Sequence, residues 1–268
     1  MKFSDSLYQA VYAAWLAGKE IMEVYSGEFN VEHKDDNSPL TLADKKAHTA
    51  IKNALQQSNI ELLSEEGAHA DFEIRKGWKK LWVVDPLDGT KEFIKRNGEF
   101  TVNIALVENG FPVLGVIYAP ELQQMYWAEK GLGVYSCPLG SRGTSSLPDI
   151  KEMIDSCERI NQQHVLPDVF TIVASRSHMS VETETFINEK KKTYGELNFI
   201  SSGSALKFCL VASGKAHCYP RFAPTMEWDT AAGQIMVEEA GRTLIDYDTK
   251  QRMRYNRENL RNNWFLVE

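Results

Sequence analysis

The sequence predicts a mixed α/β protein in which helices pack in layers against sheets. Three observations lead to this prediction. Apolar residues recur at helical spacing near the N-terminus, β-branched runs in the middle of the chain are joined by turns, and strands alternate with helices after residue 169. Because 268 residues exceed the usual size of one domain, we expect two lobes, at 1–138 and 169–268, and a connection with a surface insertion at 139–168.

Composition argues against several classes of function. Hydrophobic residues at 43% and charged residues at 25% are typical of a soluble globular protein. The net charge of -7 argues against a general nucleic-acid binder, which needs a basic surface. No signal-peptide region or stretch long enough to span a membrane is apparent. We therefore expect a cytoplasmic protein, with peripheral association at the inner face of the membrane left open.

The four cysteines are Cys137, Cys157, Cys209 and Cys218. They show no Cys-x-x-Cys spacing and no dense framework. This usage is typical of reduced thiols in a cytosol, so we expect neither disulfides nor a zinc site.

Two helices are expected in the first lobe. The first runs from Ser4 to Tyr25 with Ser4 as its N-cap. A weak strand at 29–34 and a loop precede the second, which opens at Thr41 and continues to about Gln57. Asp44 lies in the first turn of this second helix, where an acidic side chain interacts favourably with the helix dipole. From the residues alone, this structural role is the preferred one for Asp44.

Two predicted strands end in carboxylates. A strand at 60–64 is followed by Glu65 and Glu66, and a strand at 81–84 is followed by Asp85-Pro-Leu-Asp88-Gly. The turn lets Asp85 and Asp88 converge, which suits a hard cation such as Mg²⁺, and Glu65 or Glu66 could complete the cluster. Backbone groups after Gly89 could bind a phosphate beside the metal. A polar turn that caps a strand is the alternative, and for an isolated Asp-x-x-Asp it is the commoner one.

The middle of the chain is predicted to be antiparallel. Residues 100–107 and 113–118 form a hairpin, and strands at 125–128 and 134–136 continue the pattern. A polar helix is expected at 150–161, in a connection where we expect no chemistry.

The second lobe places small and basic side chains after its strands. Ser177 and His178 follow a strand at 169–174, and Gly203 and Lys207 follow a strand that begins near 199. Gly203 permits close backbone approach and Lys207 offers a point charge, so these residues suit an anion. A helix N-cap and a solvated lysine are the alternatives.

The remaining predicted elements of this lobe are helices at 181–192, 205–212 and 227–237 and strands near 217–219, 242–246 and 263–267. Arg221 lies in the loop after one of these strands. Asp229 lies near the start of the last helix, where it too has a helix-dipole explanation. Together, acidic strand ends and an anion-binding second lobe favour metal-assisted hydrolysis of a phosphate ester.

Three segments resemble the inositol monophosphatase superfamily of lithium-sensitive phosphatases. They are Leu-Leu-Ser-Glu-Glu at 62–66, Asp-Pro-Leu-Asp-Gly-Thr-Lys-Glu-Phe at 85–93 and Glu-Trp-Asp-Thr-Ala-Ala-Gly at 227–233. Three further segments are similar to the CysQ-type 3'(2'),5'-bisphosphate nucleotidases within this superfamily. They are the sequence at 88–106, Ser-Arg-Ser-His at 175–178 and Leu-Lys-Phe-Cys-Leu-Val-Ala at 206–212. The resemblance covers nearly the whole chain and implies an α-β-α-β-α sandwich of the inositol monophosphatase and fructose bisphosphatase type.

The resemblance also implies an activity and a set of residues. The activity is removal of the 3'-phosphate of adenosine 3',5'-bisphosphate to give AMP and phosphate, which clears a by-product of sulfate activation. Two or three Mg²⁺ ions would be held by Glu65, Asp85, the Leu87 carbonyl, Asp88 and Asp229. Asp44 and Thr90, with Glu65, would position and deprotonate the attacking water. The substrate would contact Asp88, Gly89, Thr90, Ser177, His178, Gly203, Lys207 and Asp229. Arg221 is our own candidate for the second phosphate, on account of its charge and its place in the loop.

Two alternatives stay open. An inositol phosphate or sugar phosphate phosphatase would share every metal ligand, although Lys207 and Ser-Arg-Ser-His favour a small nucleotide bisphosphate. A non-catalytic nucleotide-binding protein would be expected to lack a metal ligand or the water-activating pair, and the sequence retains both. The oligomeric state is not indicated.

Overall fold

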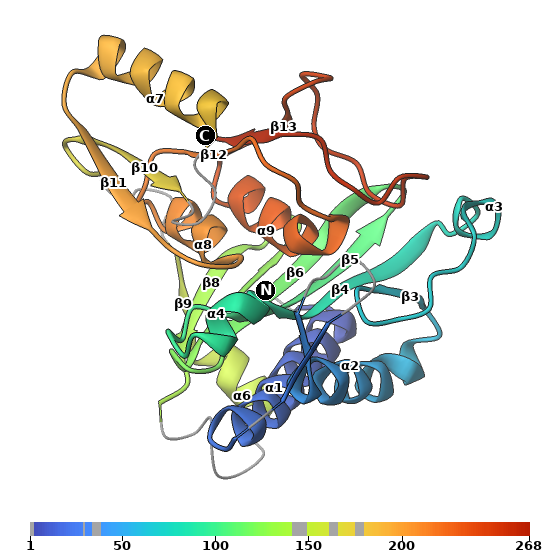
Figure 1. The fold of residues 1–268 in the computed structure, drawn as a ribbon. Coiled ribbons are helices and arrows are strands. Elements are labelled where there is room, and N and C mark those ends of the chain that lie inside the picture. Colours follow the sequence, from blue (N-terminus) through green and yellow to red (C-terminus); the bar gives the residue numbers. More distant parts are fainter. Residues whose placement is uncertain (1–2, 29, 34–38, 141–148, 161–165, 175–179) are drawn as a thin grey trace.

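The computed structural model describes residues 3–28, 30–33, 39–140, 149–160, 166–174 and 180–268 (Figure 1). Its largest sheet has seven strands in the order β3-β4-β5-β6-β7-β8-β9. Their bounds are Glu61–Ser64, Lys80–Asp88, Thr101–Glu108, Phe111–Ala119, Gln124–Glu129, Gly133–Pro138 and Glu158–Arg159. β3 pairs parallel with β4 and the other neighbours pair antiparallel, so the predicted hairpin and its antiparallel continuation are confirmed.

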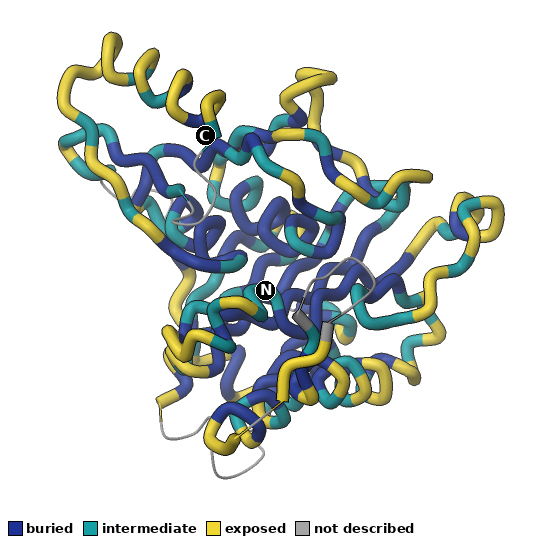
Figure 2. Tube along the Cα trace, in the orientation of Figure 1, coloured by how far each residue is buried: buried dark blue, intermediate teal, exposed yellow. Residues whose placement is uncertain are grey.

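Helices cover both faces of this sheet. α1 (Asp5–Tyr25) and α2 (Leu42–Leu55) lie on one face, and α8 (Leu206–Ala212) and α9 (Glu227–Glu239) lie on the other (Figure 1). Side chains on a strand alternate between the two faces. On β5, Val102 and Ile104 pack in the core with α1, whereas Ala105 and Val107 pack with α9. Both faces are therefore buried, as the dark interior of Figure 2 shows.

A second β layer lies beyond α8 and α9. It holds the parallel pair β10 (Phe170–Ala174) and β11 (Leu197–Ser201). It also holds the antiparallel set β12-β14-β13, at Tyr219–Arg221, Phe265–Val267 and Leu244–Asp246. α7 (Val181–Tyr194) contacts β11 and β12 on the outside. The order helix, sheet, helix, sheet, helix is the expected α-β-α-β-α arrangement (Figure 1).

The shorter elements connect these layers. They are β1 (Val31–His33), β2 (Pro39–Thr41), the 3-10 helix η1 (Gln56–Ser58), α3 (Phe72–Arg75), α4 (Thr90–Ile94) and α6 (Ile150–Asp155). The expected helix at 150–161 is too long, because the chain leaves α6 to pair β9 with β8. Arg221 lies in β12 rather than in a loop, because it pairs with Phe265 of β14. Among the helices of the described chain, none has both the length and the apolar character needed to cross a bilayer.

A disulfide joins Cys137 at the end of β8 to Cys157 after α6, with the two Cα atoms 5.0 Å apart. The expectation of four reduced thiols is therefore wrong for this pair. The two cysteines meet because α6 brings the chain back to β8, and their spacing in the sequence does not indicate this return. Cys209 and Cys218 are free and buried, and burial raises the pKa of the Cys218 thiol to about 12.

A glycine sets the distance between α9 and the large sheet. A Cβ added to Gly115 on β6 would lie 2.6 Å from the carbonyl oxygen of Ala232 on α9. No side chain fits at this contact, so the helix packs directly on the strand backbone. α9 also contacts β4 and β5. Its first turn is thereby held close to the acidic end of β4.

Candidate active site

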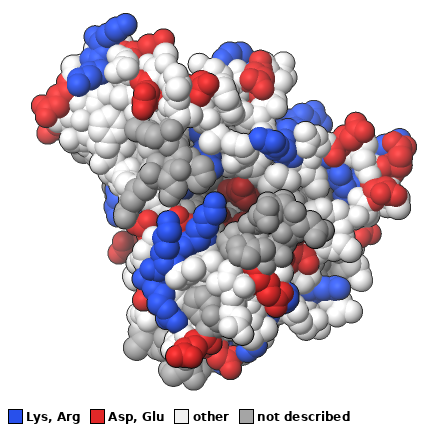
Figure 3. Space-filling view, viewed as in Figure 1, with Lys and Arg blue, Asp and Glu red and all other residues white. Residues whose placement is uncertain are grey.

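Three carboxylates converge between β4 and α9. Asp85 and Asp88 come from the end of β4, where the pairing with β5 shifts register between them. Asp229 comes from the first turn of α9. Each offers an oxygen atom, and these three atoms lie within 4.8 Å of one another. Figure 3 shows Asp and Glu side chains in a recess of this face, with Lys and Arg side chains beside it.

Burial and mutual repulsion keep these carboxylates from ionising easily. Burial, then the charges of Glu65, Asp88 and Asp229, raise the pKa of Asp85 well above its ordinary range. Burial and the Asp88 charge raise the pKa of Asp229 to about 8. Burial also raises the pKa of Asp88 to about 6, although Lys207 and Asn103 oppose the shift. A set of clustered oxygen donors with this unfavourable charge fits a hard divalent cation such as Mg²⁺.

Each carboxylate is oriented through one of its oxygens. Asp85 Oδ1 accepts a hydrogen bond from the Leu87 amide at 3.0 Å, and Asp229 Oδ2 accepts one from the Met226 amide at 2.8 Å. Asp88 Oδ2 accepts a hydrogen bond from Asn103 Nδ2 at 3.3 Å. Asn103 was not among the predicted residues. The sequence does contain a feature that could have identified it, because Asn103 is an amide side chain in a largely apolar strand and a buried polar group needs a hydrogen-bond partner.

Glu65 lies at the end of β3, beside the three carboxylates. Its backbone amide donates to the Val84 carbonyl at 3.1 Å. Its side chain hydrogen-bonds the carboxyl group of Asp85, which further raises the pKa of Asp85. Glu65 is not one of the three residues whose oxygens lie within 4.8 Å of one another. The structure thus brings Glu65 to Asp85, and its part in metal binding stays a prediction.

Asp44 combines a structural contact with a contact to Thr90. Its Oδ2 accepts hydrogen bonds from the amide and the hydroxyl of Thr41, both at 2.7 Å, which caps α2. Its Oδ1 accepts from Thr90 Oγ1 at 3.3 Å, and the same hydroxyl lies 3.3 Å from the Leu87 carbonyl oxygen. Burial raises the pKa of Asp44 to about 6. The helix-start role that the residues alone favoured therefore coexists with a hydrogen bond to Thr90, and a catalytic part for Asp44 stays a prediction.

A cavity of about 110 Å³ adjoins the carboxylates, and its walls include Asp88, Gly89, Gly203, Lys207, Arg221 and Asp229. Lys207 is 5% exposed, and its ammonium group donates to the carbonyls of Ser202 and Ser204. Burial lowers the pKa of Lys207 to about 8, while the Asp88 charge raises it. The alternative of a solvated lysine on the helix surface is therefore wrong for Lys207, which is buried.

Two polar groups of this cavity are left unsatisfied. Arg221 Nη2 donates to the Pro224 carbonyl at 3.2 Å, but its Nε is buried and has no hydrogen-bond partner among the described residues. The buried hydroxyl of Ser204 has none there either. Buried polar groups normally find a partner, so both are candidates to bind a ligand.

Two predicted glycines shape the wall between these groups. Gly89 has a φ of 89°, a conformation that a side chain would strain. A Cβ on Gly203 would lie 2.6 Å from the Glu99 carbonyl oxygen, and the Gly203 amide donates to Glu99 Oε2 at 2.9 Å. Ser177 and His178 lie outside the described residues, so their placement stays a prediction.

The layered fold and a carboxylate cluster beside a cavity that also holds Lys207 and Arg221 are features of metal-dependent phosphatases. The profile of the inositol monophosphatase family matches residues 4–265. The chain belongs to this family.

Named relatives and solved structures agree with this assignment. The chain is 44% identical over 265 residues to the 3'(2'),5'-bisphosphate nucleotidase CysQ of Salmonella typhimurium, covering 97% of this chain and 98% of the relative. It is 42% identical to the protein of the same name from Escherichia coli, with the same coverage. The crystal structure of CysQ from Bacteroides thetaiotaomicron is 49% identical, has a TM-score of 0.89 and is matched over 99% of this chain and 97% of that one. An IMPase from Thermotoga maritima, at 24% identity and a TM-score of 0.74, matches over 99% and 92% and shares the fold.

Proposed function

We propose that this protein is a Mg²⁺-dependent phosphatase that removes the 3'-phosphate of adenosine 3',5'-bisphosphate, yielding AMP and phosphate. The observation that carries the proposal is the cluster of Asp85, Asp88 and Asp229, whose oxygens lie within 4.8 Å of one another beside a cavity walled by Lys207 and Arg221. The relatives named as 3'(2'),5'-bisphosphate nucleotidases support the choice of substrate. The reaction would clear a by-product of sulfate activation.

The acidic residues have the chemistry to hold the cation. Asp85, Asp88 and Asp229 would bind it, with Glu65 and the Leu87 carbonyl as further ligands and two or three ions in total. A bound divalent cation neutralises charge on phosphate oxygens and makes water more acidic.

Asp44 and Thr90 would handle the proton of the attacking water. The Thr90 hydroxyl donates to Asp44 Oδ1, so the Thr90 oxygen is left to accept a proton from water as its own proton moves to Asp44. The pKa of about 6 keeps Asp44 a carboxylate at neutral pH. The buried contact with Thr41 holds Asp44 in place for this role.

The basic side of this cavity, formed by Lys207 and Arg221, would bind the rest of the nucleotide. Lys207 and Arg221 carry charges that suit a second phosphate, and the free Nε of Arg221 and hydroxyl of Ser204 offer hydrogen bonds to it. The backbone at Gly89, Thr90 and Gly203 can approach a phosphate closely. Ser177 and His178 remain proposed contacts to the nucleotide.

Phosphate release from four substrates tests the proposal. We expect the highest kcat/KM for adenosine 3',5'-bisphosphate, ahead of inositol 1-phosphate, inositol 1,4-bisphosphate and fructose 1,6-bisphosphate, with Mg²⁺ present and lithium added in parallel. Asp44→Asn, which preserves shape, should lower kcat by about 10² to 10⁴-fold. A preference for an inositol or sugar phosphate would overturn the substrate, and no release from any of them would favour the non-catalytic binding protein.

A further inference from the structure

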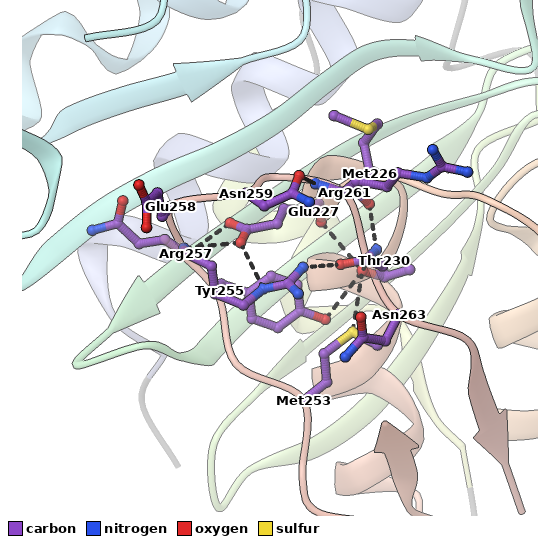
Figure 4. A network of polar contacts seen from close by, with 12 residues as sticks. Met226, Glu227, Thr230, Met253, Tyr255, Arg257, Glu258, Asn259, Arg261 and Asn263 are labelled. Atoms are coloured by element: carbon purple, nitrogen blue, oxygen red, sulfur yellow. Dashed lines mark hydrogen bonds and ion pairs between the residues drawn. The ribbon is translucent and has the colours of Figure 1, made fainter. Parts of the chain in front are cut away.

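The residues 253–262, here called the C-terminal clamp, surround the first turn of α9, the turn that carries Asp229 (Figure 4). Glu227 in this turn is fully buried. Its carboxylate accepts hydrogen bonds from the amides of Asn256 at 2.6 Å and Arg257 at 3.0 Å, and from Arg257 Nε at 3.1 Å. Two residues before Asp229, the helix is thus tied to the clamp by an ion pair that Figure 4 shows at its centre.

Asn262 holds the other side of the same turn. Its side-chain amide donates to the Met226 carbonyl at 2.6 Å and to Thr230 Oγ1 at 3.0 Å. Its backbone amide donates to the Thr225 carbonyl at 2.8 Å. Its own side-chain oxygen accepts a hydrogen bond from Arg257 Nη2 at 2.7 Å. The contacts to Glu227 and the contacts of Asn262 therefore belong to one hydrogen-bonded network. The chain is therefore hydrogen-bonded on both sides of Asp229.

Arg75 joins the clamp to the β3–β4 connection, which begins at Glu65. The Arg75 side chain is 3% exposed. Its Nη1 donates to Asn256 Oδ1 at 2.8 Å and to the Arg257 carbonyl at 3.2 Å, and its Nε donates to the Ala70 carbonyl at 2.9 Å. Asn256 Nδ2 donates back to the Arg75 carbonyl at 2.6 Å. The connection that carries Glu65 is thereby linked to the helix that carries Asp229.

These contacts oppose a force that the acidic cluster itself creates. Wherever these carboxyl groups are ionised they repel one another at this distance, and Asp85 and Asp88 are held by the pairing of β4 with β5. Asp229 is on a separate helix, so repulsion acts to move the start of α9 away from β4. We propose that Arg75, Glu227 and Asn262 are positioning residues that hold Asp229 in its metal-binding place before a cation arrives. The inference rests on the proposed function in one respect, that the cluster binds a divalent metal.

Direct metal binding tests the proposal without relying on turnover. Mn²⁺ binding to the full-length protein, measured by electron paramagnetic resonance, should be about tenfold weaker in Arg75→Met, because removal of a residue that supports metal ligands commonly costs this much. The Mn²⁺ affinity of Arg75→Lys should lie between those of wild type and Arg75→Met, since an ammonium group replaces the planar guanidinium group with its several donors. At saturating Mg²⁺, the KM for the nucleotide should stay within about twofold of wild type. Asn262→Ala should weaken Mn²⁺ binding in the same direction, which keeps the test open if Arg75→Met does not fold.

Arg252 provides a matched control at the other end of α9. Its guanidinium group makes two hydrogen bonds of 2.6 Å to Glu238, far from the carboxylates in the sequence of the helix. Arg252→Met makes the same substitution at an arginine that bonds the last turn of α9, and it should leave Mn²⁺ affinity unchanged. If Arg75→Met, Arg75→Lys and Asn262→Ala fold and bind Mn²⁺ as tightly as wild type, the clamp proposal is wrong and the proposed function stands. If wild type binds no Mn²⁺, the proposed function fails and the clamp has nothing to position.

Discussion

The two halves of the candidate site treat their charges differently. In the acidic half, formed by Asp85, Asp88 and Asp229, burial and repulsion raise every pKa. In the cationic half, Lys207 donates to two backbone carbonyls and is stabilised by Asp88. The basic side chains of the site do not offset the burial and repulsion of the acidic half, so a bound cation would stabilise it, whereas Lys207 already has partners within the chain. We therefore expect the two halves to respond differently to mutation.

The largest effect is expected from Asp85→Asn. Removal of a buried carboxylate from the acidic half should lower kcat by about 10³-fold, because the charge that holds the cation is lost. The same change relieves repulsion, so the melting temperature in EDTA should rise. Phosphate release and thermal unfolding measure the two effects. Normal turnover, or a lower melting temperature in EDTA, would contradict the account of this half.

A smaller effect is expected from Arg221→Ala in the cationic half. Loss of one charge-assisted contact to the second phosphate should raise the KM for adenosine 3',5'-bisphosphate by about tenfold with little change in kcat. The KM for inositol 1-phosphate serves as the control, since this substrate has no second phosphate, and it should not change. An unchanged KM for the nucleotide would remove Arg221 from the site.

In the absence of metal, the stability of the fold should depend on pH. Asp88 and Asp229 have folded pKa values of about 6 and about 8, against an ordinary value of 3.8. Between these values the folded protein retains protons that the unfolded chain has released, so the free energy of unfolding should fall as the pH rises from 4 to 8. Urea midpoints at pH 5 and pH 8 measure this trend in EDTA. Mg²⁺ should raise the midpoint more at pH 8, and equal midpoints in EDTA would refute the linkage.

Sequence reasoning found the parts of the site that are contiguous in the chain. Asp85 and Asp88 do converge, although through a shift of register within β4, which continues to Asp88, and not through the predicted turn after residue 84. The five-layer fold followed from resemblance and is confirmed. The burial of Lys207 was not predicted, because helix position alone does not tell which face another layer covers. The Cys137–Cys157 disulfide was missed since it depends on the path of α6.

The C-terminal clamp was also missed, for a related reason. Arg75 and Asn256 lie 181 residues apart, and neither belongs to a motif. Polar residues in a connection and near a chain end are usually solvated, so nothing in the local pattern indicates that these two are buried partners. Asn103 is different, because its place in an apolar strand is a signal that the sequence does contain.

The order of strands in the large sheet has a consequence for folding kinetics. From β4 to β8 each strand pairs with the next one in the chain, so these contacts close short loops. The contact between Arg75 and Asn256 closes a loop of 181 residues, which is far slower to form. We expect strands β4 to β8, which include Asp85 and Asp88, to form first, and α9 with Asp229 to pack against them last. Mg²⁺ should then slow unfolding while leaving the folding rate unchanged, because its binding place is completed only after the transition state.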